Sequence, residues 1–139
     1  MPTHQRNHLI VPGPYLRGVL KLDAGLSAVT TLLLTAGAST LAAATGAPAT
    51  LLFAIGVALV PWVAFLLWVA TRSAVPAALV WAVIGLNAAW ALNCVLVALG
   101  FGLALTPAGV GFAALQAAGT ALLAGLEWLG LRRSAPLPA

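Results

Sequence analysis

The stretch AALVWAVIGLNAAWALNCVLVALG, Ala77–Gly100, decides the fold class of this chain. It contains no charged residue and no proline. A helix that rises about 1.5 Å per residue needs about 20 apolar residues to cross a hydrocarbon core of about 30 Å. The stretch therefore predicts one transmembrane helix. It also carries two amide side chains that are costly to bury in lipid, Asn87 and Asn93, with Trp90 between them.

The composition of the whole chain also indicates that lipid, and not water, surrounds the protein. Of its 139 residues, 63% are hydrophobic and 6% are charged, whereas soluble domains have about 25% charged residues. Such a chain has too few polar side chains to cover a water-exposed surface, and a bilayer can solvate the excess. The sequence therefore predicts an integral membrane protein with the lipid bilayer as its main partner.

Three further apolar runs accompany the first one, and short turns that contain Pro, Gly or Ser separate them. The pattern predicts an all-α bundle of four transmembrane helices over residues 15–133. The predicted spans are 20–43, 50–71, 77–100 and 108–131. Residues 1–14 and 134–139 are predicted to be flexible cytoplasmic tails, because both contain Pro and lack a regular apolar pattern.

The six basic residues fix the expected orientation. They lie before or at the start of the first span, between the second and third, or after the fourth, and neither of the other two turns has any. Cytoplasmic loops are enriched in Lys and Arg, so we expect both termini in the cytoplasm and the chain in a bacterial plasma membrane. The expected interface anchors are Tyr15, Arg17, Lys21, Arg72, Trp128, Arg132 and Arg133. Because these cations form no patch, nucleic acid is not an expected partner.

Only two acidic residues occur in the chain, Asp23 and Glu127. In the predicted topology, both lie near the cytoplasmic ends of their helices, about one turn inside the interface. Asn87 is expected near the middle of the third span. An acid within a membrane span is by default a functional hypothesis. Asp23, Glu127 and Asn87 are therefore the candidate polar or ion-binding site, and ion pairing at the membrane boundary is the simpler alternative.

Other polar and small side chains recur at helical spacing. We expect interhelical hydrogen bonds from Asn93, Gln116, Thr31 and Thr120, with a direct bond between Asn93 and Gln116. Small residues form ridges on the third and fourth spans that allow close helix packing. Because these ridges exceed what one small bundle can use, we expect a homo-oligomer or a membrane-protein partner.

The sequence contains no pattern that indicates an enzyme. It has no Gly-rich phosphate loop, no Ser/His/Asp set, and no cluster with metal-ligand spacing. No cofactor is expected, and the single cysteine, Cys94, excludes chemistry that needs a cysteine pair. A structural or interaction role is the first functional prediction. The alternatives are a dimeric carrier or channel that is coupled to protons or cations, and a binder of apolar ligands at Trp62 and Trp90.

Three short motifs carry a resemblance to known proteins: LKLDA at Leu20–Ala24, LNAAW at Leu86–Trp90, and GLRR at Gly130–Arg133. With these, the chain resembles small uncharacterised four-span membrane proteins of actinobacteria, which implies a fold and a location but no activity. In size and number of spans it is also similar to small multidrug-resistance transporters. Those place a glutamate well inside the first helix, whereas this chain has Asp23 near the start of its predicted first span.

Overall fold

The computed structural model describes residues 9–137 and is almost entirely helical. The helices are α1 (Pro14–Ala36), α2 (Ala38–Thr45), α3 (Ala49–Thr71), α4 (Ala77–Ala98) and α5 (Pro107–Arg132). All except α2 are long and apolar enough to cross a membrane. The fold is thus an all-helical bundle with four candidate spans, which indicates a multi-pass membrane protein.

The first span differs most from its prediction over residues 20–43. Its helix begins six residues earlier, because Pro14 at the first helical position needs no N–H partner and its ring fixes φ at a helical value. It ends at Ala36, where Gly37 lets the chain turn. A Cβ at residue 37 would lie 2.7 Å from the carbonyl oxygen of Leu33. The short helix α2 follows and ends at Gly46, whose φ of +78° favours glycine.

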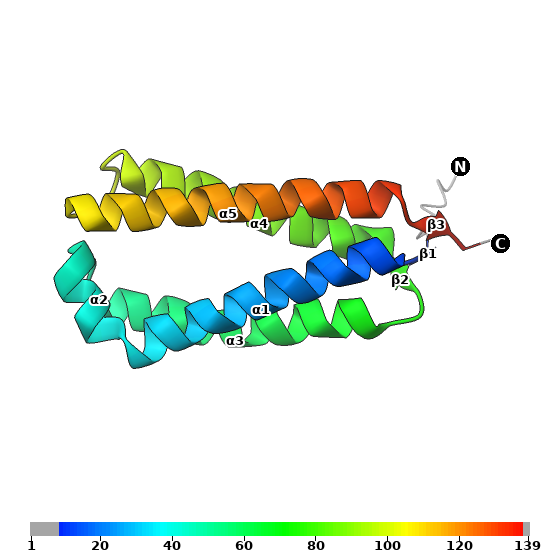
Figure 1. Ribbon diagram of the computed structural model, residues 1–139, viewed down its shortest axis with the longest axis horizontal. Coiled ribbons are helices and arrows are strands. Elements are labelled where there is room, and N and C mark those ends of the chain that lie inside the picture. The colour runs from blue at the N-terminus through cyan, green and yellow to red at the C-terminus, as the bar shows by residue number, and fades with distance from the viewer. Residues whose placement is uncertain (1–8, 138–139) are drawn as a thin grey trace, which may run out of the picture.

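The long helices associate in two pairs (Figure 1). α1 packs against α3, and α4 packs against α5. α1 also contacts α5, whereas α3 and α4 hardly touch. The larger apolar core occupies the half of the bundle that holds the start of α1 and the end of α3, and a smaller core lies in the other half. The two halves are therefore packed unequally.

A small antiparallel sheet closes the better-packed end (Figure 1). β1 (Leu9–Val11) lies between β2 (Val75–Pro76) and β3 (Ala135–Pro136). Residues 9–11 and 135–136 of the predicted tails thus form strands, and Ile10 packs in the larger core together with Val75. The rest of the two predicted tails, residues 1–8 and 138–139, lies outside the described residues.

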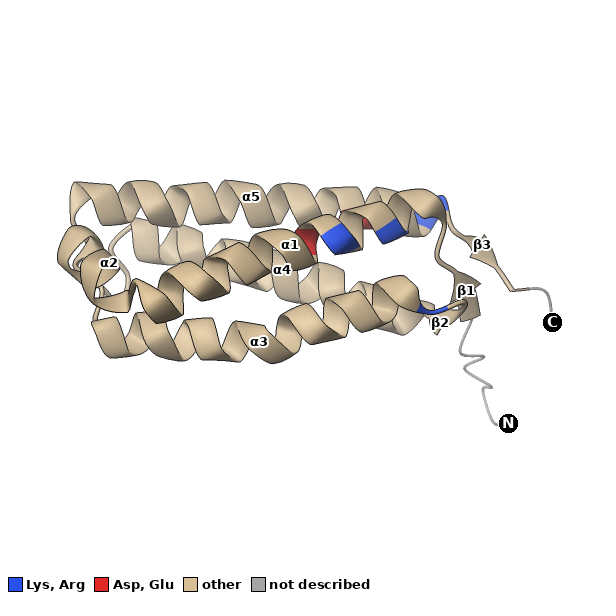
Figure 2. Cartoon of the chain, turned by 60° about the horizontal axis from the view of Figure 1, so that its bottom comes forward, with Lys and Arg blue, Asp and Glu red and all other residues tan. Residues whose placement is uncertain are grey.

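The Lys and Arg residues gather toward this same end of the bundle (Figure 2). Arg17 donates hydrogen bonds from its guanidinium to the carbonyl oxygens of Pro12, Ala70 and Arg72, at 2.9, 2.8 and 2.6 Å. It thereby satisfies carbonyl groups at the C-terminal end of α3 that have no partner within the helix.

Three other predicted anchors pair with aromatic rings at this end. Their guanidinium carbons lie 4.8–4.9 Å from a ring centroid, in the pairs Arg72–Trp68, Arg132–Trp128 and Arg133–Tyr15. Lys21 is exposed on α1.

Candidate functional site

The two acidic residues and Asn87 meet inside the bundle. The Nδ2 group of Asn87 donates to Oδ2 of Asp23 at 2.8 Å and to both carboxyl oxygens of Glu127 at 3.1 Å. The exposed fractions of Asp23, Asn87 and Glu127 are 1%, 4% and 0%. The hydroxyl of Ser27 donates to the second oxygen of Asp23 at 3.1 Å. We call Asp23, Asn87 and Glu127 the carboxyl cluster.

Each member of the cluster comes from a different long helix. Asp23 lies on α1 nine residues after its start, Asn87 lies on α4 ten residues after its start, and Glu127 lies on α5 five residues before its end. At about 1.5 Å per residue, Asp23 is about 13 Å inside its helix rather than about one turn. The earlier start of α1 accounts for this difference, and it brings Asp23 to the level of Asn87.

No basic side chain is bonded to the cluster. Within residues 9–137, the side chains that donate hydrogen bonds to the two acids are Asn87 and Ser27, and no Lys or Arg is among them. No third acid, His or Cys of the described residues joins the two carboxyl groups to make a metal-binding group. The simpler prediction of ion pairs at the membrane boundary therefore does not describe these two acids.

The predicted interhelical hydrogen bonds are wrong for the two threonines. Thr31 donates to the carbonyl oxygen of Ser27 at 2.9 Å, and Thr120 donates to that of Gln116. Each hydroxyl bonds one turn back within its own helix, a pattern that competes with contacts to other helices.

The predicted bond between Asn93 and Gln116 is also wrong. These two side chains are not hydrogen-bonded to each other in the described part of the chain, and both line the same cavity.

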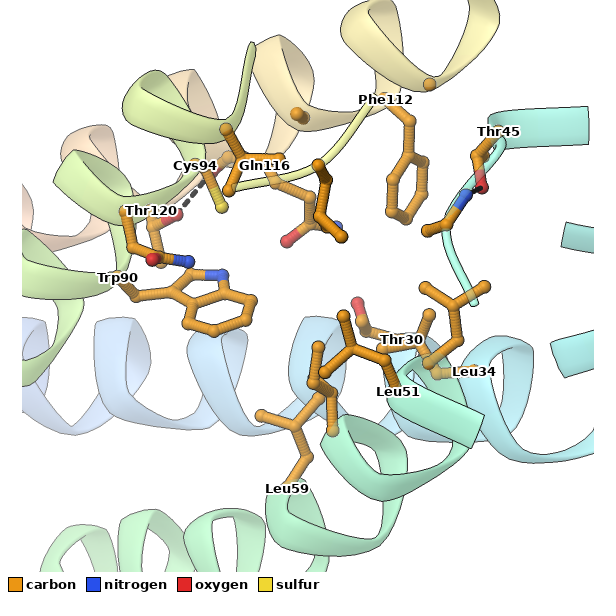
Figure 3. Close-up of a pocket in the computed structure, with 18 of the residues that line it drawn as sticks. Thr30, Leu34, Thr45, Leu51, Leu59, Trp90, Cys94, Phe112, Gln116 and Thr120 are labelled. Carbon is orange, nitrogen blue, oxygen red and sulfur yellow. Dashed lines mark hydrogen bonds between the residues drawn. The ribbon is translucent and has the colours of Figure 1, made fainter. Parts of the chain in front are cut away.

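This cavity lies between the two helix pairs, in the half away from the sheet, and its volume is about 580 Å³. All four long helices line it with mostly apolar side chains. In Figure 3, Gln116 and Phe112 point toward Thr30, Leu34 and Leu51 across the space, and the indole of Trp90 borders it. Ser27 and Asn87 belong to its lining, so the cavity extends to the carboxyl cluster. Its volume is within the range of small-molecule binding sites, about 300–1,000 Å³.

The short helix α2 closes one side of this cavity. The Thr106 hydroxyl donates to the carbonyl oxygen of Ala44 at 2.6 Å and accepts from the Gly109 N–H at 3.1 Å. The Thr106 N–H donates to the carbonyl oxygen of Thr45 at 3.0 Å. These bonds join the end of α2 to the start of α5, which explains why residues 38–45 do not continue the direction of α1.

The opposite side, between α3 and α4, is less closed. Leu59 and Trp62 of α3 and Leu86 and Trp90 of α4 line the cavity, and all four side chains are partly or largely exposed. Because α3 and α4 hardly touch, little helix-to-helix packing closes the cavity on this side.

Ser27 and most of the residues that line the cavity, Phe112 among them, were not among the predicted candidates. Ser27 bonds to Asp23, and Phe112 forms part of the cavity wall. The spacing of Asp23 and Ser27, four residues apart on one helix, is a signal that could have identified Ser27. Phe112 has no comparable signal, because the sequence of an apolar helix does not show which face an aromatic side chain lies on.

Comparison with known protein families, curated proteins and solved structures finds no match to this chain. The resemblance to small actinobacterial membrane proteins therefore stays a prediction.

Proposed function

We propose that this protein is a non-enzymatic carrier whose carboxyl cluster takes up and releases a proton or a monovalent cation within the membrane. The observation that carries the proposal is that two buried carboxyl groups share one amide, and that no Lys or Arg of residues 9–137 is hydrogen-bonded to either of them. Two ionised carboxyl groups that accept from the same NH₂ group lie close together, and like charges repel strongly in a medium of low dielectric constant. A proton or cation between the two carboxyl groups removes this repulsion, so the cluster has a physical reason to bind one.

A structural or interaction role, the first prediction from the sequence, accounts less well for this arrangement. Charged side chains inside a membrane are costly and commonly mark ion pathways or proton relays. Helix packing needs neither of the two acids, since apolar residues would fill the same space at lower cost.

Ion flux in proteoliposomes tests the proposal. We expect wild-type protein to dissipate an imposed gradient of protons or of a monovalent cation, measured with a dye trapped in the lumen. Asp23→Asn and Glu127→Gln should each lower the rate at least about tenfold, which corresponds to about 1.4 kcal/mol. Lys21→Gln is the matched control, because it also removes one charge from α1 but at an exposed position. Equal rates in all four proteins, or no flux with any cation, would contradict the proposal.

We propose further that the end of the bundle with the sheet faces the cytoplasm of a bacterial cell. The support is the concentration of Arg and Lys at this end. In a Cys94→Ala background, we expect Ser73→Cys, between α3 and α4, to react with a membrane-impermeant maleimide only in inside-out vesicles. Gly102→Cys, between α4 and α5, should react only in intact spheroplasts. The reverse pattern would invert the orientation.

We also propose that the carrier works as a homodimer through the outer face of α4. This face carries the stripe of small residues that was expected to allow close packing of helices. In the structure Ala78, Ala82, Gly85 and Ala89 are all exposed, and a Cβ at Gly85 would meet no other atom within 4 Å. Small residues let helices approach closely in lipid, where apolar area alone gives no drive to associate.

Disulfide crosslinking in native membranes tests the dimer. In a Cys94→Ala background, we expect oxidation of Ala82→Cys to give a dimer band, because a two-fold axis brings a residue near its own copy. Leu22→Cys, which is 51% exposed on α1, should stay monomeric under the same conditions. Only monomer from both variants would remove the dimer.

A further inference from the structure

The amide oxygen of Asn87 is the starting point for a second proposal. Both carboxyl groups accept hydrogen bonds from Asn87, and only the NH₂ end of an amide can donate them. This fixes the orientation of the amide and turns its Oδ1 away from the acids. None of the described residues donates a hydrogen bond to this oxygen. Among the same residues, every fully buried polar side-chain atom has a hydrogen-bond partner, so Oδ1 is not fully buried. Since Asn87 lines the cavity and is 4% exposed, its Oδ1 is accessible from there.

From this geometry we infer that the cavity binds an elongated apolar molecule whose head group donates one hydrogen bond to Asn87. The walls around the space are apolar over most of their area, with residues such as Leu34, Leu52, Leu59 and Phe112. They suit an alkyl or isoprenoid chain. A hydrogen-bond donor is required at the head because Asn87 presents an acceptor there. The two carboxyl groups behind the amide add negative potential, which favours a donor over an acceptor such as an ester or ketone.

The surroundings of the cavity indicate how such a molecule would enter. The side next to α5 is closed by the hydrogen bonds between Thr106 and the end of α2. The side between α3 and α4 has few contacts, and its lining residues Leu59, Trp62 and Trp90 are partly exposed. A membrane-dissolved ligand therefore has a lateral route that does not cross water.

Tryptophan quenching by brominated probes tests this inference independently of ion transport. The probes are 11-bromoundecan-1-ol, which has a donor head, and methyl 11-bromoundecanoate, which has an acceptor head on a similar chain. Bromine quenches indoles at short range, and Trp62 and Trp90 line the cavity. With the protein in nanodiscs, we expect a saturable quenching component for the alcohol with an apparent affinity at least tenfold higher than for the ester. Trp90→Phe should reduce this component, and Trp81→Phe should leave it unchanged.

A cavity-filling variant provides the matched control. Ala113→Phe places a ring in the space, because Ala113 is buried and belongs to the lining. Ala114→Phe adds the same ring to the next residue, which is exposed. We expect the saturable component to weaken at least tenfold in the first variant and to persist in the second. The inference is overturned if alcohol and ester quench alike, or if the two variants behave alike.

A third probe, 11-bromoundecylamine, distinguishes two sources of the donor. Binding of the amine tighter than the alcohol at neutral pH would assign the head group as an ammonium, and equal or weaker binding would assign it as a neutral hydroxyl. Both results support a donor head. If wild-type protein transports no ion but still shows this selectivity, the carrier proposal fails while the ligand site stands.

Discussion

Asn87→Leu should be the most destabilising single substitution in the carboxyl cluster, by about 3 kcal/mol. Leucine has a similar volume but donates no hydrogen bond, so it leaves Asp23 and Glu127 buried without the amide that both accept from. A buried acid without a partner is costly in a low-dielectric interior. Reversible unfolding in mixed micelles with increasing SDS would measure the change in the free energy of unfolding.

Two comparisons separate this explanation from a general effect of leucine on α4. Asn93→Leu removes an exposed amide from the same helix, and we expect little change or a small gain in stability. Combining Asn87→Leu with Asp23→Leu and Glu127→Met should restore most of the loss, because apolar side chains of similar size replace the whole buried network. If the triple variant is no more stable than Asn87→Leu alone, unpaired acids are not the cause.

The helices were predictable because their signals are local. Apolar runs of sufficient length are interrupted by Pro, Gly and Arg, and three of the four long helices begin and end within two residues of the predicted spans. The first span was harder. Its polar start, with Arg17 and Lys21, resembles an interfacial turn, yet Arg17 is bound to the carbonyl groups of α3 instead. That contact joins residues more than fifty positions apart, and no local pattern contains it.

The direction in which each helix faces could not be predicted in the same way. In water, an apolar stripe marks the buried face, but in lipid both faces of a span are apolar. The sequence therefore did not indicate whether the small-residue stripe of α4 faces the bundle or the lipid, and in the structure Gly85 and its neighbours are exposed. The three polar residues Asp23, Asn87 and Glu127 could be named as candidates because they are rare. Their shared hydrogen bonds depend on the rotation and depth of three helices.

Gly109→Ala should have the second largest effect, because Gly109 lies where the start of α5 meets the end of α2. A Cβ at this position would collide with the carbonyl oxygen of Thr45, and backbone atoms cannot move aside as a flexible side chain can. Overpacking of this kind costs about 1–3 kcal/mol, more than the gain of about 1 kcal/mol from replacing glycine by alanine in a helix. We therefore expect the free energy of unfolding in SDS to fall by up to about 2 kcal/mol, together with weaker closure of the cavity by α2.

Gly111→Ala is the matched control two residues further along α5, where a Cβ meets no atom within 4 Å. That variant should be as stable as wild type or more so, and equal behaviour of the two variants would show that α2 does not pack against α5 as closely as the structure indicates.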